Sequence, residues 1–254
     1  MWSREKCLEC RDCQDACTGS AISFPDDSLV LDKRKCDLCG ACVNACHSQA
    51  LKLIGKEMTV AQIMQEIEKD TLFYDGSKGG VTFSGGEPLM QPSFLLDLLK
   101  ACKEIEIHTA VDTCGYANSD ILLEISKHVD LFLYDVKVID DEKHIKFTGV
   151  SNKLVLDNLN RLSKIGQKII VRFALILGVN NDKEDILELG AFVSSLENVE
   201  EISILPYHKG GIEKLKRLRK LEDSLFEGHS PTAETISEIE RTLKDFGLTT
   251  QIGG

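Results

Sequence analysis

Short apolar runs alternate with amphipathic stretches along most of the chain. Apolar runs rich in β-branched residues predict strands at residues 81–84, 107–113, 131–136, 169–177 and 202–205, with a weaker one at 248–252. Apolar positions three and four residues apart predict helices at residues 92–103, 119–128, 153–165, 183–196 and 232–246. Thr59 and Gln62 form a capping box that would open a further helix ending near Glu68. Buried strands that alternate with helices of this length are typical of βα units around a parallel sheet.

Polar residues and glycines follow the predicted strands. In folds with a parallel sheet, ligands gather at the carboxyl ends of the strands. The segments at these ends are Ser84-Gly85-Gly86-Glu87-Pro88, Asp112-Thr113-Cys114-Gly115, Asp135-Val136-Lys137, Gly178-Val179-Asn180-Asn181 and Leu205-Pro206-Tyr207-His208, and Arg172 lies within the fourth strand. Each segment alone is also explained by a helix cap or a tight turn. Together they would line one rim with N–H groups, carboxylates, cations and an imidazole, which suits a zwitterionic ligand that also carries a ribose.

Eight of the ten cysteines form two copies of the spacing C-x2-C-x2-C-x3-C. The first copy is Cys7, Cys10, Cys13 and Cys17, and the second is Cys36, Cys39, Cys42 and Cys46. This spacing is the signature of bacterial two-cluster ferredoxins, in which the fourth cysteine of each run binds the other cluster. We therefore expect two 4Fe–4S clusters, one held by Cys7, Cys10, Cys13 and Cys46 and the other by Cys36, Cys39, Cys42 and Cys17.

Zinc and disulfides are the alternative explanations of these cysteines. Structural zinc sites usually pair two C-x2-C knuckles instead of running four cysteines together. Disulfides need an oxidising compartment, and residues 1–6 carry no apolar signal segment. The chain departs from the ferredoxin pattern in one respect, because Thr18 and His47 stand where a proline usually follows the fourth cysteine.

The length and composition allow one large domain beside a small module. With 254 residues, we expect a ferredoxin-like α+β module at residues 1–55 and an α/β domain at residues 56–254. No apolar stretch reaches the length of a membrane span, so we expect a cytoplasmic protein without a membrane partner. The net charge of −11 argues against a nucleic-acid partner, whose phosphates would repel the chain.

The rim motifs, in the order in which they occur, resemble those of the glycyl-radical enzyme activating enzymes, which are radical S-adenosylmethionine (SAM) proteins. The segment at residues 79–89, with the sequence GGVTFSGGEPL, is the most specific part of the resemblance. The similarity runs from about Gly55 to the end of the chain. A two-cluster insert before it is similar to the subgroup that activates lyases, dehydratases and decarboxylases other than pyruvate formate-lyase.

The resemblance implies a partial parallel (β/α)6 barrel with SAM at its rim. It would place Gly86 and Glu87 at the methionyl amino group, with Gly85 also in the cofactor-binding site. Asp135, Val136 and Lys137 would line the SAM site. It would also place Arg172 near the SAM carboxylate and His208 at the adenosyl end. In relatives, the positions of Asp112, Thr113 and Asp135 hold a monovalent cation.

The resemblance also implies an activity and partners. In the family, a 4Fe–4S cluster reduces SAM, and the resulting 5′-deoxyadenosyl radical takes a hydrogen atom from a backbone glycine of a glycyl-radical enzyme. The two ferredoxin-type clusters would pass electrons to that radical cluster from a flavodoxin or a ferredoxin. The chemistry belongs to the cofactor, while protein groups bind, orient and exclude water.

One part of the family pattern is absent from this sequence. The radical cluster needs a C-x3-C-x2-C loop, but only Cys102 and Cys114 remain outside the two ferredoxin-type runs. Cys102 lies on a predicted amphipathic helix, where a free cysteine behaves as a small core residue. We therefore expect a chain shortened at its N-terminus, with a barrel that lacks its first strand and with the radical cluster only in a full-length form. The alternative is a non-catalytic iron–sulfur electron-transfer protein.

Overall fold

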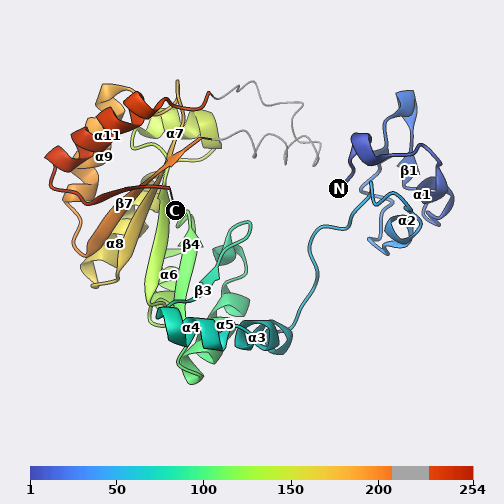
Figure 1. Ribbon diagram of the computed structural model, residues 1–254, viewed down its shortest axis with the longest axis horizontal. Helices are drawn as coiled ribbons and strands as arrows, with labels where there is room; N and C mark the ends of the chain where they lie inside the picture. The colour runs from blue at the N-terminus through green and yellow to red at the C-terminus, as the bar shows by residue number, and fades with distance from the viewer. Residues whose placement is uncertain (208–228, 254) are drawn as a thin grey trace. The chain divides into compact units, whose positions relative to one another are not determined.

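The computed structural model describes residues 1–207 and 229–253, which divide into two compact units (Figure 1). The described part of the smaller unit is residues 1–57. The larger unit comprises residues 58–207 and 229–253. His208, one of the predicted site residues, lies outside the described residues.

The larger unit is built on a parallel sheet of six strands. Their bounds are β3 (Gly80–Phe83), β4 (His108–Thr113), β5 (Leu131–Val136), β6 (Ile169–Leu175), β7 (Val199–Pro206) and β8 (Thr250–Ile252). Each strand pairs in parallel with the next one along the chain, so the spatial order is the sequence order. The sheet confirms the predicted α/β fold, and its strands fall where the apolar runs predicted them.

Helices connect the strands and cover the sheet (Figure 1). Their bounds are α3 (Val60–Glu68), α4 (Thr71–Ser77), η3 (Pro88–Met90), α5 (Pro92–Glu104), α6 (Ser119–Ser126), α7 (Asp141–Thr148), α8 (Lys153–Lys164), α9 (Lys183–Ser194) and α11 (Ala233–Asp245). The predicted capping box of α3 is present, with the Thr59 and Gln62 side chains each accepting from the backbone N–H of the other.

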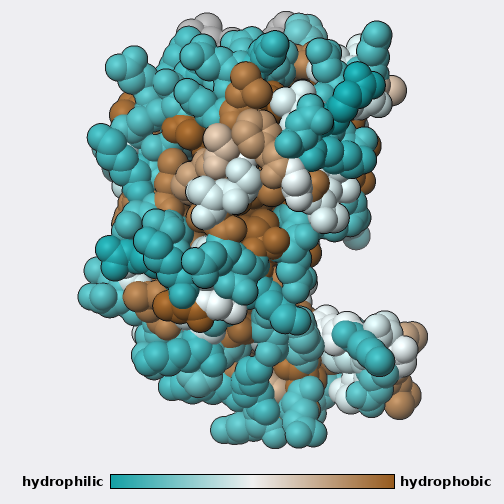
Figure 2. Space-filling model, turned by 90° about the vertical axis from the view of Figure 1, so that its left-hand side faces the viewer, coloured by the Kyte–Doolittle hydropathy of each residue, from teal (hydrophilic) through white to brown (hydrophobic). Residues whose placement is uncertain are grey.

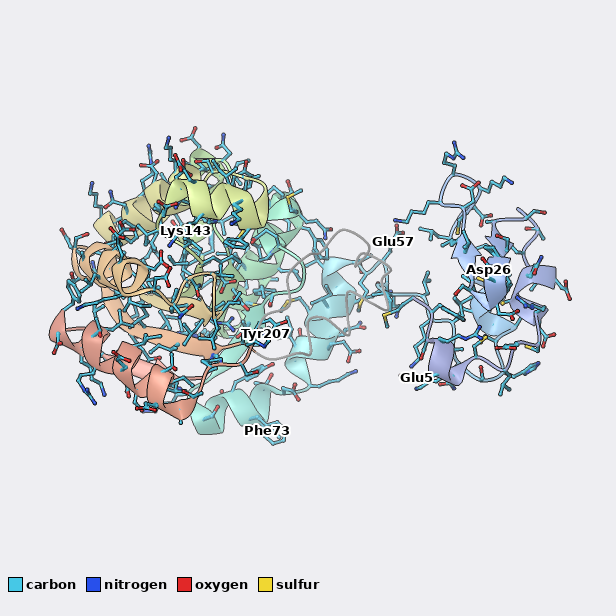
Figure 3. All side chains as sticks on the ribbon, turned by 90° about the horizontal axis from the view of Figure 1, so that it is seen from above. Glu5, Asp26, Glu57, Phe73, Lys143 and Tyr207 are labelled. Carbon is cyan, nitrogen blue, oxygen red and sulfur yellow. The ribbon has the colours of Figure 1, made fainter. Side chains whose placement is uncertain are left out.

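The sequence analysis missed α4 and α7 because neither has a continuous apolar stripe. α7 is a mostly hydrophilic helix that is defined by its ends. The Asp140 side chain accepts from the Lys143 N–H at 2.6 Å, and Gly149 ends the helix with a φ of 82°, a conformation that glycine adopts without strain. α4 exposes Leu72 and Phe73, and Phe73 projects away from the helix (Figure 3).

The core lies between the sheet and its helices. Phe132, Tyr134 and Val136 alternate along β5 and are at most 1% exposed. Because successive side chains of a strand point to opposite faces, the alternate positions, which include Asp135, lie on the other face of the sheet. Asp135 of β5 pairs in register with Arg172 of β6, which is also an alternate, partly buried position. The strand pattern therefore separates a hydrophobic face from a face that carries charges.

The smaller unit is a compact α+β arrangement. Its elements are η1 (Arg4–Lys6), α1 (Asp12–Asp15), β1 (Ile22–Ser23), η2 (Pro25–Asp27), β2 (Val30–Leu31) and α2 (Ala41–Asn44). β1 and β2 form an antiparallel hairpin, and an isolated bridge joins Trp2 to Leu51. Its small core holds cysteines from both runs beside Ile22, Leu29 and Leu51.

Hydrophilic residues predominate on one face of the molecule. Charged and polar residues cover most of the face shown in Figure 2, with hydrophobic residues visible between them. Within residues 1–207 and 229–253, no helix combines the length and the apolar character that crossing a membrane requires.

Asp130 joins β4 to α5. One of its carboxylate oxygens accepts from the Thr109 N–H at 2.9 Å and from the Thr109 hydroxyl at 3.1 Å, and the other oxygen pairs with Lys103. Burial by itself raises the pKa of this carboxyl, but the bonds to Lys103 and Thr109 outweigh it, so the pKa is lowered overall.

The change Asp130→Asn should reduce the free energy of unfolding at neutral pH by about 1–3 kcal/mol, because it removes a charged acceptor from Lys103 and Thr109. Since the folded-state pKa of Asp130 lies below the unfolded value of about 3.9, its contribution is complete above that pH and is lost as the pH falls through the folded-state pKa. Urea denaturation should show the gap between wild type and variant closing in acid. The exposed change Asp75→Asn serves as the control, and an equal loss there would contradict the assignment.

Candidate cofactor-binding sites

The smaller unit brings its eight cysteines together in two groups. Cys7, Cys10, Cys13 and Cys46, here termed the first cysteine set, line one cavity together with Trp2 and Phe24. Cys17, Cys36, Cys39 and Cys42, the second cysteine set, line another. Each cavity thus receives three cysteines from one run and the fourth cysteine from the other run.

The backbone repeats its conformation in the two runs. Glu9 and Leu38 both have a positive φ, near 58° and 60°. Arg11 and Gly40, which precede α1 and α2, are also left-handed, with φ of 69° and 79°. These pairs are separated by the same number of residues as Cys7 and Cys36. A left-handed residue is uncommon outside glycine, so its recurrence at matching positions indicates that both loops are bent to one shape.

Backbone N–H groups point at the fourth cysteine of each run. The Ala21 N–H donates to the Cys17 sulfur at 3.2 Å, and the Leu51 N–H donates to the Cys46 sulfur at 3.4 Å. Burial raises the pKa of the Cys46 thiol, but hydrogen bonds from Leu51 and Ser48 outweigh it and lower the pKa overall. N–H groups aimed at sulfur stabilise a thiolate, which is the form that binds metal.

The third cysteine of each run has a raised pKa. Burial, followed by the nearby Cys46, raises the pKa of Cys13, and burial followed by Cys17 raises the pKa of Cys42. Each of these neighbours belongs to the other run. Among the described residues, no three His, Cys, Asp or Glu side chains converge closely enough to hold a single metal ion. The thiols of each set are instead spread around a cavity, an arrangement that fits a polynuclear cluster.

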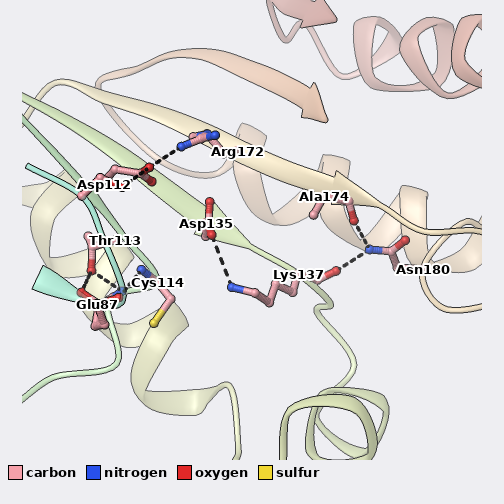
Figure 4. Close-up of polar contacts among 11 residues, drawn as sticks. Glu87, Asp112, Thr113, Cys114, Asp135, Lys137, Arg172, Ala174 and Asn180 are labelled. Carbon is pink, nitrogen blue, oxygen red and sulfur yellow. Dashed lines mark hydrogen bonds and ion pairs between the residues drawn. The ribbon is translucent and has the colours of Figure 1, made fainter. Parts of the chain in front are cut away.

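Glu87 anchors the turn that follows β3 (Figure 4). One of its oxygens accepts from the Thr113 hydroxyl at 2.6 Å and from the Leu89 N–H at 3.1 Å, and the other accepts from the Cys114 N–H at 2.9 Å. Its carboxylate thus ties the turn to the end of β4. The predicted contact of Glu87 with a ligand amino group stays a prediction, and its side chain is already held by three donors.

The two glycines before Glu87 differ in their backbone conformation. Gly85 has a φ of 136°, which strains any other residue. Gly86 has an ordinary backbone conformation, and a Cβ atom placed on it would meet no atom within 4 Å. The space in front of Gly86 is therefore open, and only Gly85 is needed for the turn itself.

Charged side chains from three neighbouring strands meet on the face of the sheet opposite Phe132 and Tyr134 (Figure 4). Arg172 of β6 pairs with Asp112 of β4 at 2.7 Å, and Ser84 donates to the same carboxylate at 3.1 Å. Asp135 of β5 lies 3.4 Å from the Lys137 ammonium group. Burial raises the pKa of Asp135, and the neighbouring Asp112 adds to this rise, while Lys137 and Arg172 oppose it.

Val136 differs from its two predicted neighbours. Its side chain is 1% exposed and belongs to the hydrophobic core, on the helix-covered side of β5. Only its backbone is left to face the rim. The structure brings Asp112, Thr113, Asp135, Lys137 and Arg172 to one end of the sheet. The ligand roles predicted for them stay predictions.

Asn180 is a positioning residue that the sequence analysis did not single out. Its amide nitrogen donates to the carbonyl oxygens of Lys137 and Ala174, both at 2.7 Å, and its oxygen accepts from the Ile176 N–H at 2.8 Å. It is 1% exposed and joins the end of β5 to the end of β6. The signal was the polar segment after the fourth strand, but which of its two asparagines turns inward depends on the loop conformation.

Buried residues hold the loop after β4 in place. Gly115 has a φ of 66°, and a Cβ atom there would stand 1.7 Å from the Tyr134 hydroxyl. The buried Asn158 donates to the carbonyl oxygens of Gly115 and Ala117 at 2.8 and 2.9 Å. These contacts hold Cys114 at the rim, where burial followed by a hydrogen bond with Glu87 raises the pKa of its thiol.

Cys102 lies far from this chemistry. It is fully buried in α5, where its sulfur contacts that of Met64 at 3.8 Å and burial raises the pKa of its thiol to about 11. A thiol of this kind is protonated at neutral pH and does not act as a metal ligand. The expectation that Cys102 is a core residue is confirmed.

Comparisons with known proteins find matches over most of the chain. Residues 34–190 match the family model of the radical SAM superfamily. The chain is 40% identical over 260 residues to a trans-4-hydroxy-L-proline dehydratase activating enzyme of Clostridioides difficile, covering 100% of the chain and 84% of the relative. It is 36% identical over 249 residues to a 4-hydroxyphenylacetate decarboxylase activating enzyme of Clostridium scatologenes, covering 96% of the chain and 79% of the relative.

A solved structure supports the same grouping. The crystal structure of a domain of pyruvate-formate lyase-activating enzyme from Bacteroides vulgatus matches with a TM-score of 0.59 and 36% identity. The match covers 69% of this chain and 99% of that domain.

The change Asn180→Ala should lower the free energy of unfolding by about 2 kcal/mol, because it leaves the Lys137 carbonyl and the Ile176 N–H without their partner. The matched control is Asn181→Ala, which removes a single acceptor from the Gly178 N–H in the same loop. Thermal denaturation of both variants compares the two losses. A larger loss for Asn181→Ala than for Asn180→Ala would contradict the role given to Asn180.

Proposed function

Because the chain belongs to the radical SAM superfamily, and within it to the glycyl-radical enzyme activating enzymes, we propose that it binds two 4Fe–4S clusters and SAM. The clusters would be held by residues of the smaller unit, and SAM at the strand ends of the larger unit. The partner would be a glycyl-radical enzyme of the dehydratase, lyase or decarboxylase class, since the similar proteins activate enzymes of these kinds.

One observation carries the cluster proposal: each cavity of the smaller unit is lined by four thiols, three from one run and one from the other. A single zinc ion would need four ligands converging on one point. The repeated left-handed residues and the N–H groups aimed at Cys17 and Cys46 suit thiolates around a larger group. When bound, such clusters supply one-electron transfer, and the protein supplies their ligands, their hydrogen bonds and their exclusion from water.

The SAM proposal rests on the rim of the sheet. Gly86 leaves open space beside the backbone, and a ligand there can approach without meeting a Cβ atom. Asp135 and Lys137 offer a carboxylate for an amino group and an ammonium for a carboxylate, and the Arg172 guanidinium lies beside Asp112. These groups are complementary to the charges of a methionyl zwitterion.

The ten cysteines of the chain provide ligands for two clusters and not for a third. Eight of the ten cysteines belong to the two sets, Cys102 is buried and Cys114 stands alone at the rim. The described cysteines therefore offer no third set for a cluster that binds SAM directly. In the proposed role, the two clusters relay electrons from a flavodoxin or a ferredoxin towards such a cluster. A non-catalytic iron–sulfur electron carrier remains the alternative function, and the presence of Gly86, Asp135 and Lys137 at the rim favours the activating role.

Anaerobically reconstituted protein should contain about eight iron atoms per chain, as two 4Fe–4S clusters require. The double change Cys7→Ala with Cys46→Ala removes two ligands of one cluster and should reduce the content to about four iron atoms. The double change Cys7→Ala with Cys17→Ala removes one ligand from each cluster and should lead to the loss of both clusters. Iron and sulfide quantitation with electron paramagnetic resonance measures the outcome.

The matched control for this experiment is Cys114→Ala, which should retain the wild-type iron content. Equal losses in the two double variants would contradict the exchange of the fourth cysteines. About twelve iron atoms in the wild type would mean that a third ligand set exists.

The change Gly86→Leu should weaken SAM binding at least tenfold, because the side chain would fill the open space beside the backbone, while the free energy of unfolding should change little. The control is Gly76→Leu in α4, where a Cβ atom also meets nothing within 4 Å. Isothermal titration calorimetry with SAM compares the variants. An unchanged affinity in Gly86→Leu would remove this glycine from the site.

A further inference from the structure

The two cysteine sets differ in the charges that surround them. The cavity of the second cysteine set is lined by Lys33, Lys35 and Lys52 and by one acidic residue, Asp37. Lys33, Arg34 and Lys35 directly precede Cys36, and all three are exposed. Arg34 is 93% exposed, and its contact with Asp32 is long, at 3.6 Å. Lys33, Arg34, Lys35 and Lys52 are here called the basic face.

The first cysteine set has no comparable excess of positive charge. Arg4 pairs with Glu9 at 2.8 Å, and Arg11 pairs with Asp27 at 2.7 Å while its guanidinium stacks on Phe24. Arg11 is the charged residue that lines this cavity. The two arginines near this set are therefore paired with carboxylates, whereas three lysines line the cavity of the second cysteine set.

Apolar side chains stand exposed beside the basic face. Leu38, Leu53 and Ile54 are 68%, 52% and 57% exposed, and all three line the cavity of the second cysteine set. A group of exposed apolar side chains rimmed by charges is the usual anatomy of a protein–protein interface. Cys39 of the same set is itself exposed, so a group bound there lies close to the surface.

We propose that the basic face, with Leu38, Leu53 and Ile54, is the docking site for an acidic one-electron carrier protein, so that electrons enter at the second cysteine set. This inference rests on the proposed function, because it requires a cluster in that set. The occupant follows from charge complementarity: a net charge of −11 repels acidic proteins from the molecule as a whole, and the basic face is a local exception.

The reduced carrier supplies the electron for the transfer step. One electron leaves the reduced carrier, which is oxidised, and enters the group held by the second cysteine set, which is reduced. No covalent bond forms or breaks. Each set has one exposed cysteine, Cys10 or Cys39, so the electrostatic attraction at the basic face is what favours entry here over entry at the first cysteine set.

The experiment uses the reconstituted full chain and a reduced acidic flavodoxin as the probe. Stopped-flow absorbance gives the second-order rate constant of cluster reduction over a series of salt concentrations. Lys33→Glu and Lys35→Glu should each lower this rate constant about fivefold at low salt, and the wild-type rate should fall as salt rises. Lys6→Glu, which makes the same charge change next to Cys7, should have a much smaller effect.

The apolar part of the docking site is tested separately. Leu53→Asn should weaken flavodoxin binding about threefold in calorimetry, since it removes apolar area from the interface. Leu72→Asn, at an 85% exposed position of the larger unit, is its control and should leave the affinity unchanged. Neither position holds a cluster ligand.

Three results would overturn the docking site. These are equal effects of Lys6→Glu and Lys33→Glu, a rate constant that does not depend on salt, and a wild-type chain that self-associates through the basic face in sedimentation experiments. Iron content and reduction by dithionite are measured on the same samples. A wild type without iron contradicts the proposed function, whereas a wild type with full iron and no response to Lys33→Glu contradicts the docking site alone.

Discussion

Parallel pairing of consecutive strands is the constraint on which the larger unit depends. Because all six strands run in one direction, the turns after β3, β4 and β5 meet at one edge of the sheet. Glu87 can then bond Thr113 and Cys114, and Arg172 can reach Asp112 across the intervening strand. The rim is thus a set of mutually bonded groups held in place before any ligand arrives, which is the property that precise binding requires.

The repeating parts of this architecture were predictable from the sequence, and the particular contacts were not. Buried strands leave short apolar runs in the sequence, so β5 and β6 were predicted to within a few residues. α7 was not predicted because it is defined by its end residues and has no apolar stripe. Asn180 was missed because a single inward-turned asparagine depends on a loop whose conformation no local pattern fixes.

The smaller unit couples its folding to what it binds. Its hydrophobic core is small, and four of the residues within or against it are cysteines of both runs. Burial and neighbouring thiols raise the pKa of Cys13 and of Cys42, so ionising these two thiols is unfavourable in the absence of metal. Iron would replace this repulsion with bonds, and each run would complete the site of the other. Metal binding would then contribute directly to the stability of the fold.

The charges on the smaller unit give a reason why two clusters would serve better than one. Two sets would separate the tasks: the second cysteine set lies beside exposed cations that would attract a donor, whereas Arg4 and Arg11 near the first are paired with Glu9 and Asp27. Positive charge near a cluster also favours its reduced form, so the same lysines that attract the donor would favour arrival of the electron at that set.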